Sequence, residues 1–134
     1  MITAEIQRHE QQNRNNLVWL NICELSDLVL GSGVCALIPS KHTVQEQVAI
    51  FCIKDNEGQI ATYAVSNWDP IGKANVMSRG IICSINGEIM VSSPLYKQHY
   101  SLATGQCLEN TECLLKVYES CIKDGSLLLK ITQA

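Results

Sequence analysis

The sequence predicts an all-β fold, a sandwich or a barrel of short antiparallel strands, and three observations support this. Short apolar runs are separated by turn signals roughly every eight to twelve residues. Asn-Gly and Asp-Gly pairs, which suit the positive φ angles of two-residue hairpin turns, stand between several runs. The segment 66–78 does not alternate and contains Pro, Gly, Asn and Asp. It predicts a long surface loop inserted between strands.

Length and charge limit the class of protein. The chain has 134 residues, of which 46% are hydrophobic, a size that suits one domain. Ten Lys and Arg face 13 Asp and Glu, a formal net charge of -3, whereas nucleic-acid binding needs a clustered basic face. The longest apolar run, 48–53, is far shorter than the roughly 20 residues of a membrane-spanning helix. We therefore expect neither a nucleic-acid nor a membrane partner.

The cysteines predict a reduced protein. Their number is seven, which is odd, and the N-terminal residues hold no apolar core of a secretory signal, so at least one thiol is free. No Cys-x-x-Cys pair of the kind that binds zinc or acts as a redox switch is present. Several cysteines lie in apolar runs, where a thiol behaves as a small buried hydrophobe. We expect a cytoplasmic protein with free cysteines, namely Cys23, Cys35, Cys52, Cys83, Cys107, Cys113 and Cys121.

The predicted elements begin after a polar N-terminal extension, residues 1–16. A short helix over 3–14 with Thr3 as its N-cap would have only Ile6 as an apolar contact, so we expect this extension to be solvated and partly ordered. The predicted strands then follow one another through the domain 17–134: 17–23, 34–38, 48–54, 59–65, 80–85, 88–92, 99–102, 114–122 and 126–131.

Turn residues predict which strands pair. Asn86-Gly87 separates GIICSI from EIMVSS, and Asp124-Gly125 separates ESCIK from SLLLK, so each pair predicts a hairpin. A longer loop is predicted at 56–58, and Thr104-Gly105 marks another turn. Gly31-Ser-Gly33 is also interpreted as a turn, because it lacks the third glycine of a dinucleotide-binding loop.

The chain lacks the residues of a self-contained active site. Gly72-Lys73 resembles the end of a phosphate-binding loop, but Ala74 stands where Ser or Thr would hold magnesium. Ser93 is followed by proline and lacks the glycine-flanked elbow that exposes a nucleophile. His99 is the one histidine placed beside possible chemistry. No set of base, nucleophile and oxyanion donor can be assembled, so we expect no catalytic residue on this chain.

The two loop regions resemble a known domain type. The strand GQIATYAVSN, the hairpin GIICSINGEIMVSS and the segment PLYKQHYSLATGQCLEN resemble a Rieske-type domain, in which Cys-x-His and Cys-x-x-His hold a 2Fe-2S cluster. The four matching positions here are Asn67, Asp69, Ser93 and Tyr96. Their hard oxygen atoms do not suit iron held by thiolates and imidazoles, so no cofactor and no metal are expected on this chain.

The resemblance implies a more specific fold and function. It predicts an antiparallel β-sandwich base and a smaller inserted lobe, 67–105, which corresponds to the cluster-binding subdomain. The segments WLNICELSDLVLGSGVCALI, SNWDPIGKANVMSRGI and SSPLYKQHYSLATGQCLE are similar to the small subunits of assimilatory NAD(P)H nitrite reductases. The resemblance implies an accessory subunit of a complex that reduces nitrite to ammonia. The large subunit, its partner, is expected to carry FAD, siroheme and an iron–sulfur cluster.

Two questions stay open at this level. The loop residues either build turns or contact the partner; the residues with a predicted docking role are Trp68, Pro70, Lys73, Lys97 and His99. Trp68 either projects as an interface anchor or packs with Leu95, Tyr96 and Met77 as a replacement core where the cluster would be. The alternative function is a stand-alone, cluster-free Rieske-like module that binds another protein or a small ligand.

Overall fold

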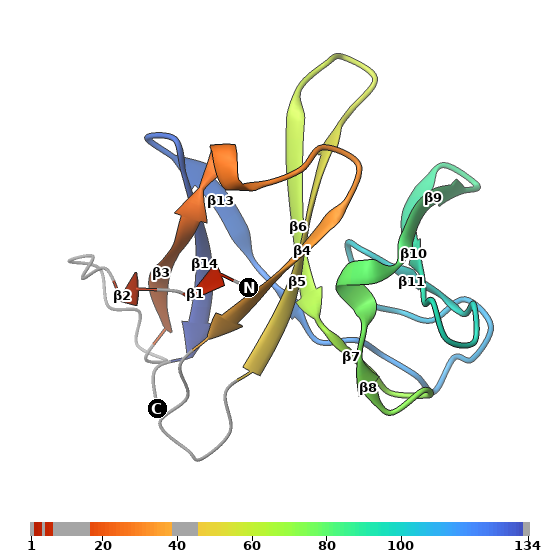
Figure 1. The fold of residues 1–134 in the computed structure, drawn as a ribbon. Helices are drawn as coiled ribbons and strands as arrows, with labels where there is room; N and C mark the ends of the chain where they lie inside the picture. Colours follow the sequence, from red (N-terminus) through yellow and green to blue (C-terminus); the bar gives the residue numbers. More distant parts are fainter. Residues whose placement is uncertain (1, 4, 7–16, 39–45, 133–134) are drawn as a thin grey trace.

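Figure 1 shows a computed structural model, which describes residues 2–3, 5–6, 17–38 and 46–132. The described residues form strands, turns and two short 3-10 helices, and they contain no α-helix, so the all-β prediction is confirmed. None of the helices in this described part has the length and apolar character needed to cross a membrane.

Two sheets form the base of the molecule. The five-stranded sheet has the order β1-β4-β5-β6-β12, and the four-stranded sheet has the order β13-β14-β3-β2. All neighbours in them are antiparallel except β1 and β4. The strands of the first sheet are β1 (Ile2–Thr3), β4 (Gly33–Ile38), β5 (Glu46–Lys54), β6 (Ile60–Ser66) and β12 (Val117–Tyr118). Those of the second are β2 (Glu5–Ile6), β3 (Leu17–Glu24), β13 (Ser120–Lys123) and β14 (Ser126–Thr132).

A smaller lobe lies beside the five-stranded sheet (Figure 1). It contains a three-stranded sheet in the order β11-β10-β9 and a two-stranded hairpin of β7 and β8. Its elements are β7 (Trp68–Asp69), β8 (Ala74–Asn75), the 3-10 helix η2 (Met77–Arg79), β9 (Ile81–Ile85), β10 (Glu88–Ser92) and β11 (His99–Ser101). The other 3-10 helix, η1 (Leu25–Asp27), follows β3 in the base. The predicted hairpin of 80–85 and 88–92 is confirmed by the pairing of β9 with β10.

Strand β5 is buried on both faces. Val48 and Ile50 face a core between the two base sheets, which also contains Leu20 of β3. Ala49 and Phe51 face a second core that the base shares with the lobe. A strand covered on both sides needs apolar residues at successive positions, and this explains why the sequence shows a continuous apolar run here instead of alternation.

Three local predictions need correction. Of the predicted helix 3–14, only Thr3 and Glu5–Ile6 are described, and they belong to strands β1 and β2, which add to β4 and β3. The rest of that segment lies outside the described residues. The predicted strand 114–122 is divided: Leu114 makes only an isolated bridge to Gln106, and β12 and β13 follow separately, in different sheets. The segment 66–78 is not an irregular loop, because it folds into the β7–β8 hairpin and η2.

The turn predictions are confirmed by backbone angles. Asn86 and Gly87 have φ values of 51° and 81°, and Asp124 and Gly125 have values of 52° and 77°, as a type I′ turn requires at both central residues. Gly31 has a φ of 76°, which fits its interpretation as a turn residue.

A carboxylate at the start of β5 links that strand to β12. The Tyr118 hydroxyl donates a hydrogen bond to Glu46 Oε2, and Lys116 Nζ lies 3.3 Å from the same oxygen. The tyrosine hydrogen bond, and to a smaller degree Lys116, lower the pKa of Glu46 although burial opposes them. Burial and the neighbouring carboxylate raise the pKa of Tyr118.

This contact predicts an acid-dependent loss of stability. A carboxyl group whose folded pKa lies below its unfolded value stabilises the fold at pH values above the unfolded pKa, and this contribution is lost as the pH falls through the folded pKa. We therefore expect Glu46→Gln to lower the melting temperature at neutral pH and to make its decline below about pH 4.5 shallower. Thermal unfolding followed by circular dichroism across that range measures both. Parallel pH profiles of the two proteins would contradict the assignment.

Candidate functional site

Two connections at the edge of the lobe form the candidate site. The first runs from Asn67 through the β7–β8 turn, and the second joins β10 to β11 through residues 93–98. They contain the four positions that match cluster ligands of the Rieske pattern: Asn67, Asp69, Ser93 and Tyr96. The first three are buried, whereas Tyr96 is exposed.

Asn67 fixes the first connection to the base. Its Oδ1 accepts a hydrogen bond from the Ser78 backbone N–H at 2.7 Å, and its Nδ2 donates to Gln47 Oε1 at 3.0 Å. The Asn67 carbonyl accepts the backbone N–H groups of Val76 and Met77. A buried amide with all these partners is a structural anchor, since each polar group that is removed from water needs a partner.

Asp69 joins the two connections. Its Oδ1 accepts the backbone N–H groups of Ile71 at 2.8 Å and Gly72 at 2.9 Å, which closes the β7–β8 turn. The Ser93 hydroxyl donates to its other oxygen, Oδ2, at 2.5 Å. Ser93 Oγ in turn accepts the backbone N–H of Leu95 at 3.3 Å. A direct hydrogen bond between two former ligand positions therefore bridges the connections.

The turns approach each other closely at Gly72. A Cβ atom on this residue would lie 2.4 Å from Leu95 Cδ1, so the second connection packs directly on the glycine. Lys73 and Lys97 each occupy the left-handed region, with φ values of 60° and 66°, and both are exposed. The two connections thus end in a pair of adjoining turns, each with a solvent-facing lysine.

Apolar side chains also reach solvent at these turns. The exposed fractions are 44% for Trp68, 45% for Leu95 and 64% for Tyr96. The interpretation that these three side chains form a replacement core is therefore wrong, and only Met77 is buried. The physical reason is that the Asp69–Ser93 hydrogen bond and the contact of Leu95 with Gly72 already close the space between the connections.

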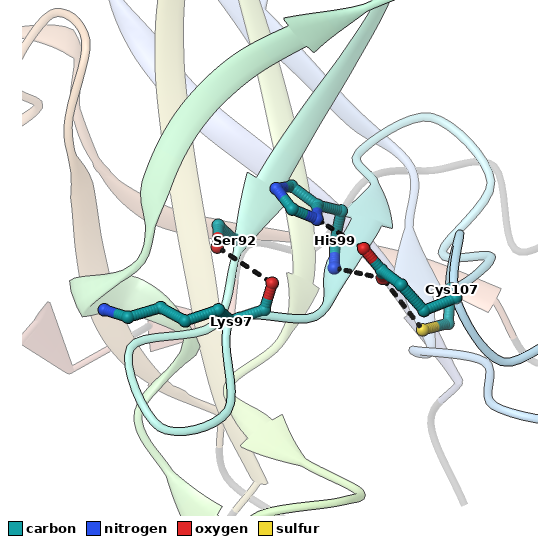
Figure 2. Close-up of polar contacts among 5 residues, drawn as sticks. Ser92, Lys97, His99 and Cys107 are labelled. Carbon is teal, nitrogen blue, oxygen red and sulfur yellow. Dashed lines mark hydrogen bonds and ion pairs between the residues drawn. The ribbon is translucent and has the colours of Figure 1, made fainter.

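His99 is held by a residue that the sequence analysis missed. In Figure 2 its ring points toward an acidic side chain of the following loop: His99 Nδ1 lies 2.6 Å from Glu109 Oε2. The His99 backbone N–H donates to Glu109 Oε1 at 2.7 Å. Burial alone would raise the pKa of Glu109, but the hydrogen bonds from His99 hold it below its usual value. No sequence signal connects these residues, because they do not belong to one motif.

The predicted docking residues therefore do not form one equivalent set. Trp68, Lys73 and Lys97 are exposed, Pro70 is half-buried, and His99 is half-buried on β11 with its ring engaged by Glu109. The docking role of all five stays a prediction. We define the tip surface as Trp68, Lys73, Leu95, Tyr96 and Lys97.

The residues of this site do not fit a 2Fe-2S cluster. Asp69 and Ser93 are hydrogen-bonded to each other, Asn67 is hydrogen-bonded to Gln47, and Tyr96 is 64% exposed, unlike the other three. Oxygen and amide donors that are already engaged cannot replace two thiolates and two imidazoles. Within the described residues, no three His, Cys, Asp or Glu side chains are placed to hold a metal ion.

Comparisons with known proteins identify the family. Residues 18–130 match the Rieske-like 2Fe-2S domain family. The nitrite reductase (NADH) small subunit of Salmonella typhimurium is 41% identical over 112 residues, which cover 84% of this chain and 96% of that protein.

One solved structure and one larger protein extend this result. The Escherichia coli protein NirD has 37% identity and a TM-score of 0.71, over 87% of this chain and 99% of that one. A nitrite reductase NAD(P)H large subunit from Klebsiella oxytoca is 30% identical over 109 residues, which cover 81% of this chain but 10% of that protein. The chain therefore belongs to the Rieske-like 2Fe-2S domain family and, within it, to the nitrite reductase small subunits.

Proposed function

We propose that this chain is the accessory small subunit of a nitrite reductase complex that reduces nitrite to ammonia with NAD(P)H. The observation that carries this proposal is the similarity of this chain to proteins named as nitrite reductase small subunits. The Klebsiella oxytoca large subunit adds to it, because a segment of that protein is also similar to this chain. Because a segment similar to this chain is part of that larger protein, we infer that the two subunits act in contact. The large subunit is the partner.

The redox cofactors belong on the partner in this proposal. FAD, siroheme and an iron–sulfur cluster are assigned to the large subunit, and none to this chain. The engaged oxygen and amide donors at Asn67, Asp69 and Ser93 support that division. The seven free thiols support a reducing compartment, the cytoplasm, as the place of action.

Iron analysis tests the division of cofactors. We expect the purified chain to be colourless and to contain no stoichiometric iron or acid-labile sulfide, because oxygen donors stand at all four ligand positions. Absorption spectroscopy and metal analysis of anaerobically purified protein measure this. Charge-transfer bands with about two irons per chain would contradict it, since that is the content of one 2Fe-2S cluster.

The tip surface is the proposed contact with the large subunit. It combines exposed aromatic and aliphatic side chains with two lysines, and aromatic residues are enriched at the centres of interfaces. The carboxylate of Asp69 in these turns is buried and hydrogen-bonded to Ser93, so the exposed charge of the two turns is positive. A partner surface with an apolar centre and an acidic rim complements it.

Charge reversal at the rim tests this contact. We expect Lys73→Glu with Lys97→Glu to slow association with the large subunit, because rim charges act chiefly on the encounter rate. Surface plasmon resonance at several salt concentrations measures the rates, and the melting temperature checks the fold. The matched control is Lys54→Glu with Lys123→Glu, which makes the same charge change at exposed lysines of the base. Equal association rates for both double variants would show that the docking surface does not include the tip surface.

The structure gives little support to the alternative, a stand-alone ligand-binding module. A hollow of about 540 Å³ beside Asn67 is lined by Cys35, Gln47 and Arg79 among others, and it is open to solvent. Small-molecule sites generally enclose most of the ligand's surface. The accessory-subunit proposal is therefore preferred.

A further inference from the structure

Two cysteines stand opposite each other in the segment that follows the lobe. Gln106 and Leu114 form an antiparallel bridge, and the bonds around it run from Cys107 N–H to the Cys113 carbonyl at 3.1 Å and from Leu115 N–H to the Gly105 carbonyl at 2.8 Å. One backbone bond thus joins Cys107 to Cys113, while the Cys113 N–H donates to the Asn110 carbonyl at 3.0 Å and Cys107 also forms a bridge with Tyr100. A direct backbone N–H···O bond makes the two cysteines neighbours across the turn, within the roughly 4.4–6.8 Å between Cα atoms that a disulfide spans.

The two side chains also pack against the same hydrophobic core. Cys107 is a buried member of the core shared by base and lobe, and Cys113 packs against that same core while it keeps some exposure. In the strand registers of the described residues, each of the other five cysteines lies opposite a residue of another type: Cys23 with Leu127, Cys35 with Ala49, Cys52 with Thr62, Cys83 with Met90 and Cys121 with Leu128.

We propose that Cys107 and Cys113 are a redox-modification site that forms a reversible intramolecular disulfide when the protein meets a peroxide. The partly exposed Cys113 thiol reacts first: its sulfur bonds to one peroxide oxygen, the O–O bond breaks, and one water leaves as the sulfenic acid forms. The Cys107 sulfur then attacks the Cys113 sulfur and displaces the oxygen as a second water. Two thiols are oxidised by two electrons, and one peroxide is reduced to two waters.

The disulfide changes the contacts of the loop between the cysteines. Cys107 Sγ lies 3.8 Å from Glu109 Oε1 in the reduced protein, and Figure 2 shows this contact beside the one between Glu109 and His99. When Cys107 joins the disulfide, its thiol hydrogen is lost, and Glu109 no longer receives that contact. The crosslink restrains the segment that carries Glu109 and thereby the setting of His99 on β11. This inference does not depend on the proposed function.

One peptide reports the bond directly. Trypsin cleaves after Lys97 and Lys116, and the peptide 98–116 contains Cys107 and Cys113 and no further cysteine. We expect hydrogen peroxide treatment of the intact protein, followed by alkylation under denaturing conditions, to yield this peptide unalkylated and about 2 Da lighter than the dithiol. Dithiothreitol before alkylation restores both alkyl groups. Mass spectrometry measures the two forms.

Matched controls lie in the same protein. Cys83, which is partly exposed and opposite Met90, occurs in the peptide 80–97 and should stay alkylated after mild treatment. The variant Cys113→Ser should never give the lighter peptide, whereas Cys83→Ser should give it as the parent does. If both cysteines of 98–116 stay fully alkylated at peroxide doses that oxidise Cys83, the proposal is wrong. The same holds if Cys107 or Cys113 bonds instead to a cysteine of another peptide.

Discussion

Replacing Asp69 by alanine is expected to lower the free energy of unfolding by about 3 kcal/mol, since hydrogen bonds to a charged group contribute roughly 1.5–3 kcal/mol and their loss leaves buried donors unpaired. The donors concerned are the backbone N–H groups of Ile71 and Gly72 and the hydroxyl of Ser93. Because the bond to Ser93 bridges the two connections, both turns of the tip surface should loosen together. Urea unfolding measures the change, and hydrogen exchange at residues 69–73 and 93–98 locates it.

Asp55 provides the matched control for this variant. Its Oδ1 also accepts two backbone N–H groups, those of Glu57 and Gln59, both at 2.9 Å, in an exposed turn between β5 and β6. Water can satisfy these donors when the carboxylate is removed, so Asp55→Ala is expected to cost less than about 1 kcal/mol. Similar losses of unfolding free energy for the two variants would show that burial of Asp69 and its hydrogen bond to Ser93 add nothing to stability.

Replacing Trp68 by alanine is expected to weaken binding of the large subunit by about 2 kcal/mol, close to thirtyfold, while the melting temperature stays nearly unchanged. The side chain is 44% exposed, so its truncation opens little space in the core of the isolated chain. A tryptophan at the centre of an interface loses far more contact when it is truncated in the complex. Isothermal titration with the purified large subunit measures the affinity.

Leu30→Ala is the comparison for Trp68→Ala. Leu30 is 51% exposed and lies on the base, where it makes a bridge to Cys52 of β5. A loss of affinity in the Leu30 variant with none in the Trp68 variant would place the interface on the base. A large fall in melting temperature for Trp68→Ala would show that the indole supports the fold instead.

The site shows how two loops can stay together without a metal cluster. A cluster holds its loops through four covalent ligand bonds, and here a carboxylate and a hydroxyl at two of the matching positions hold the corresponding connections by a hydrogen bond. Asn67, at a third position, turns its amide toward the base and anchors the first connection there. The retained geometry keeps two turns and their exposed side chains adjacent. In the proposed function, that arrangement serves recognition of the partner.

Two of the hairpins were determined by local sequence. Asn86-Gly87 and Asp124-Gly125 prefer positive φ at both positions, so they specify hairpins whatever surrounds them, and the structure contains both. The replacement of thiolate and imidazole at the four ligand positions is likewise a property of residue type. These features could be predicted because each depends on residues that are neighbours in the chain.

Tertiary structure alone decided how distant residues meet. Asp69 and Ser93 are 24 positions apart, and although the Rieske pattern places both around one cluster, only the folded chain shows the hydrogen bond between them. His99 and Glu109 are 10 positions apart and share no motif, so their contact has no sequence signal. The sequence shows a continuous apolar run in β5, but only the packing of the lobe on one face and of the second base sheet on the other explains why both faces are apolar. Which of the two predicted roles Trp68 takes was decided in the same way: the hydrogen bond between Asp69 and Ser93 joins the connections directly, and Trp68 is left 44% exposed.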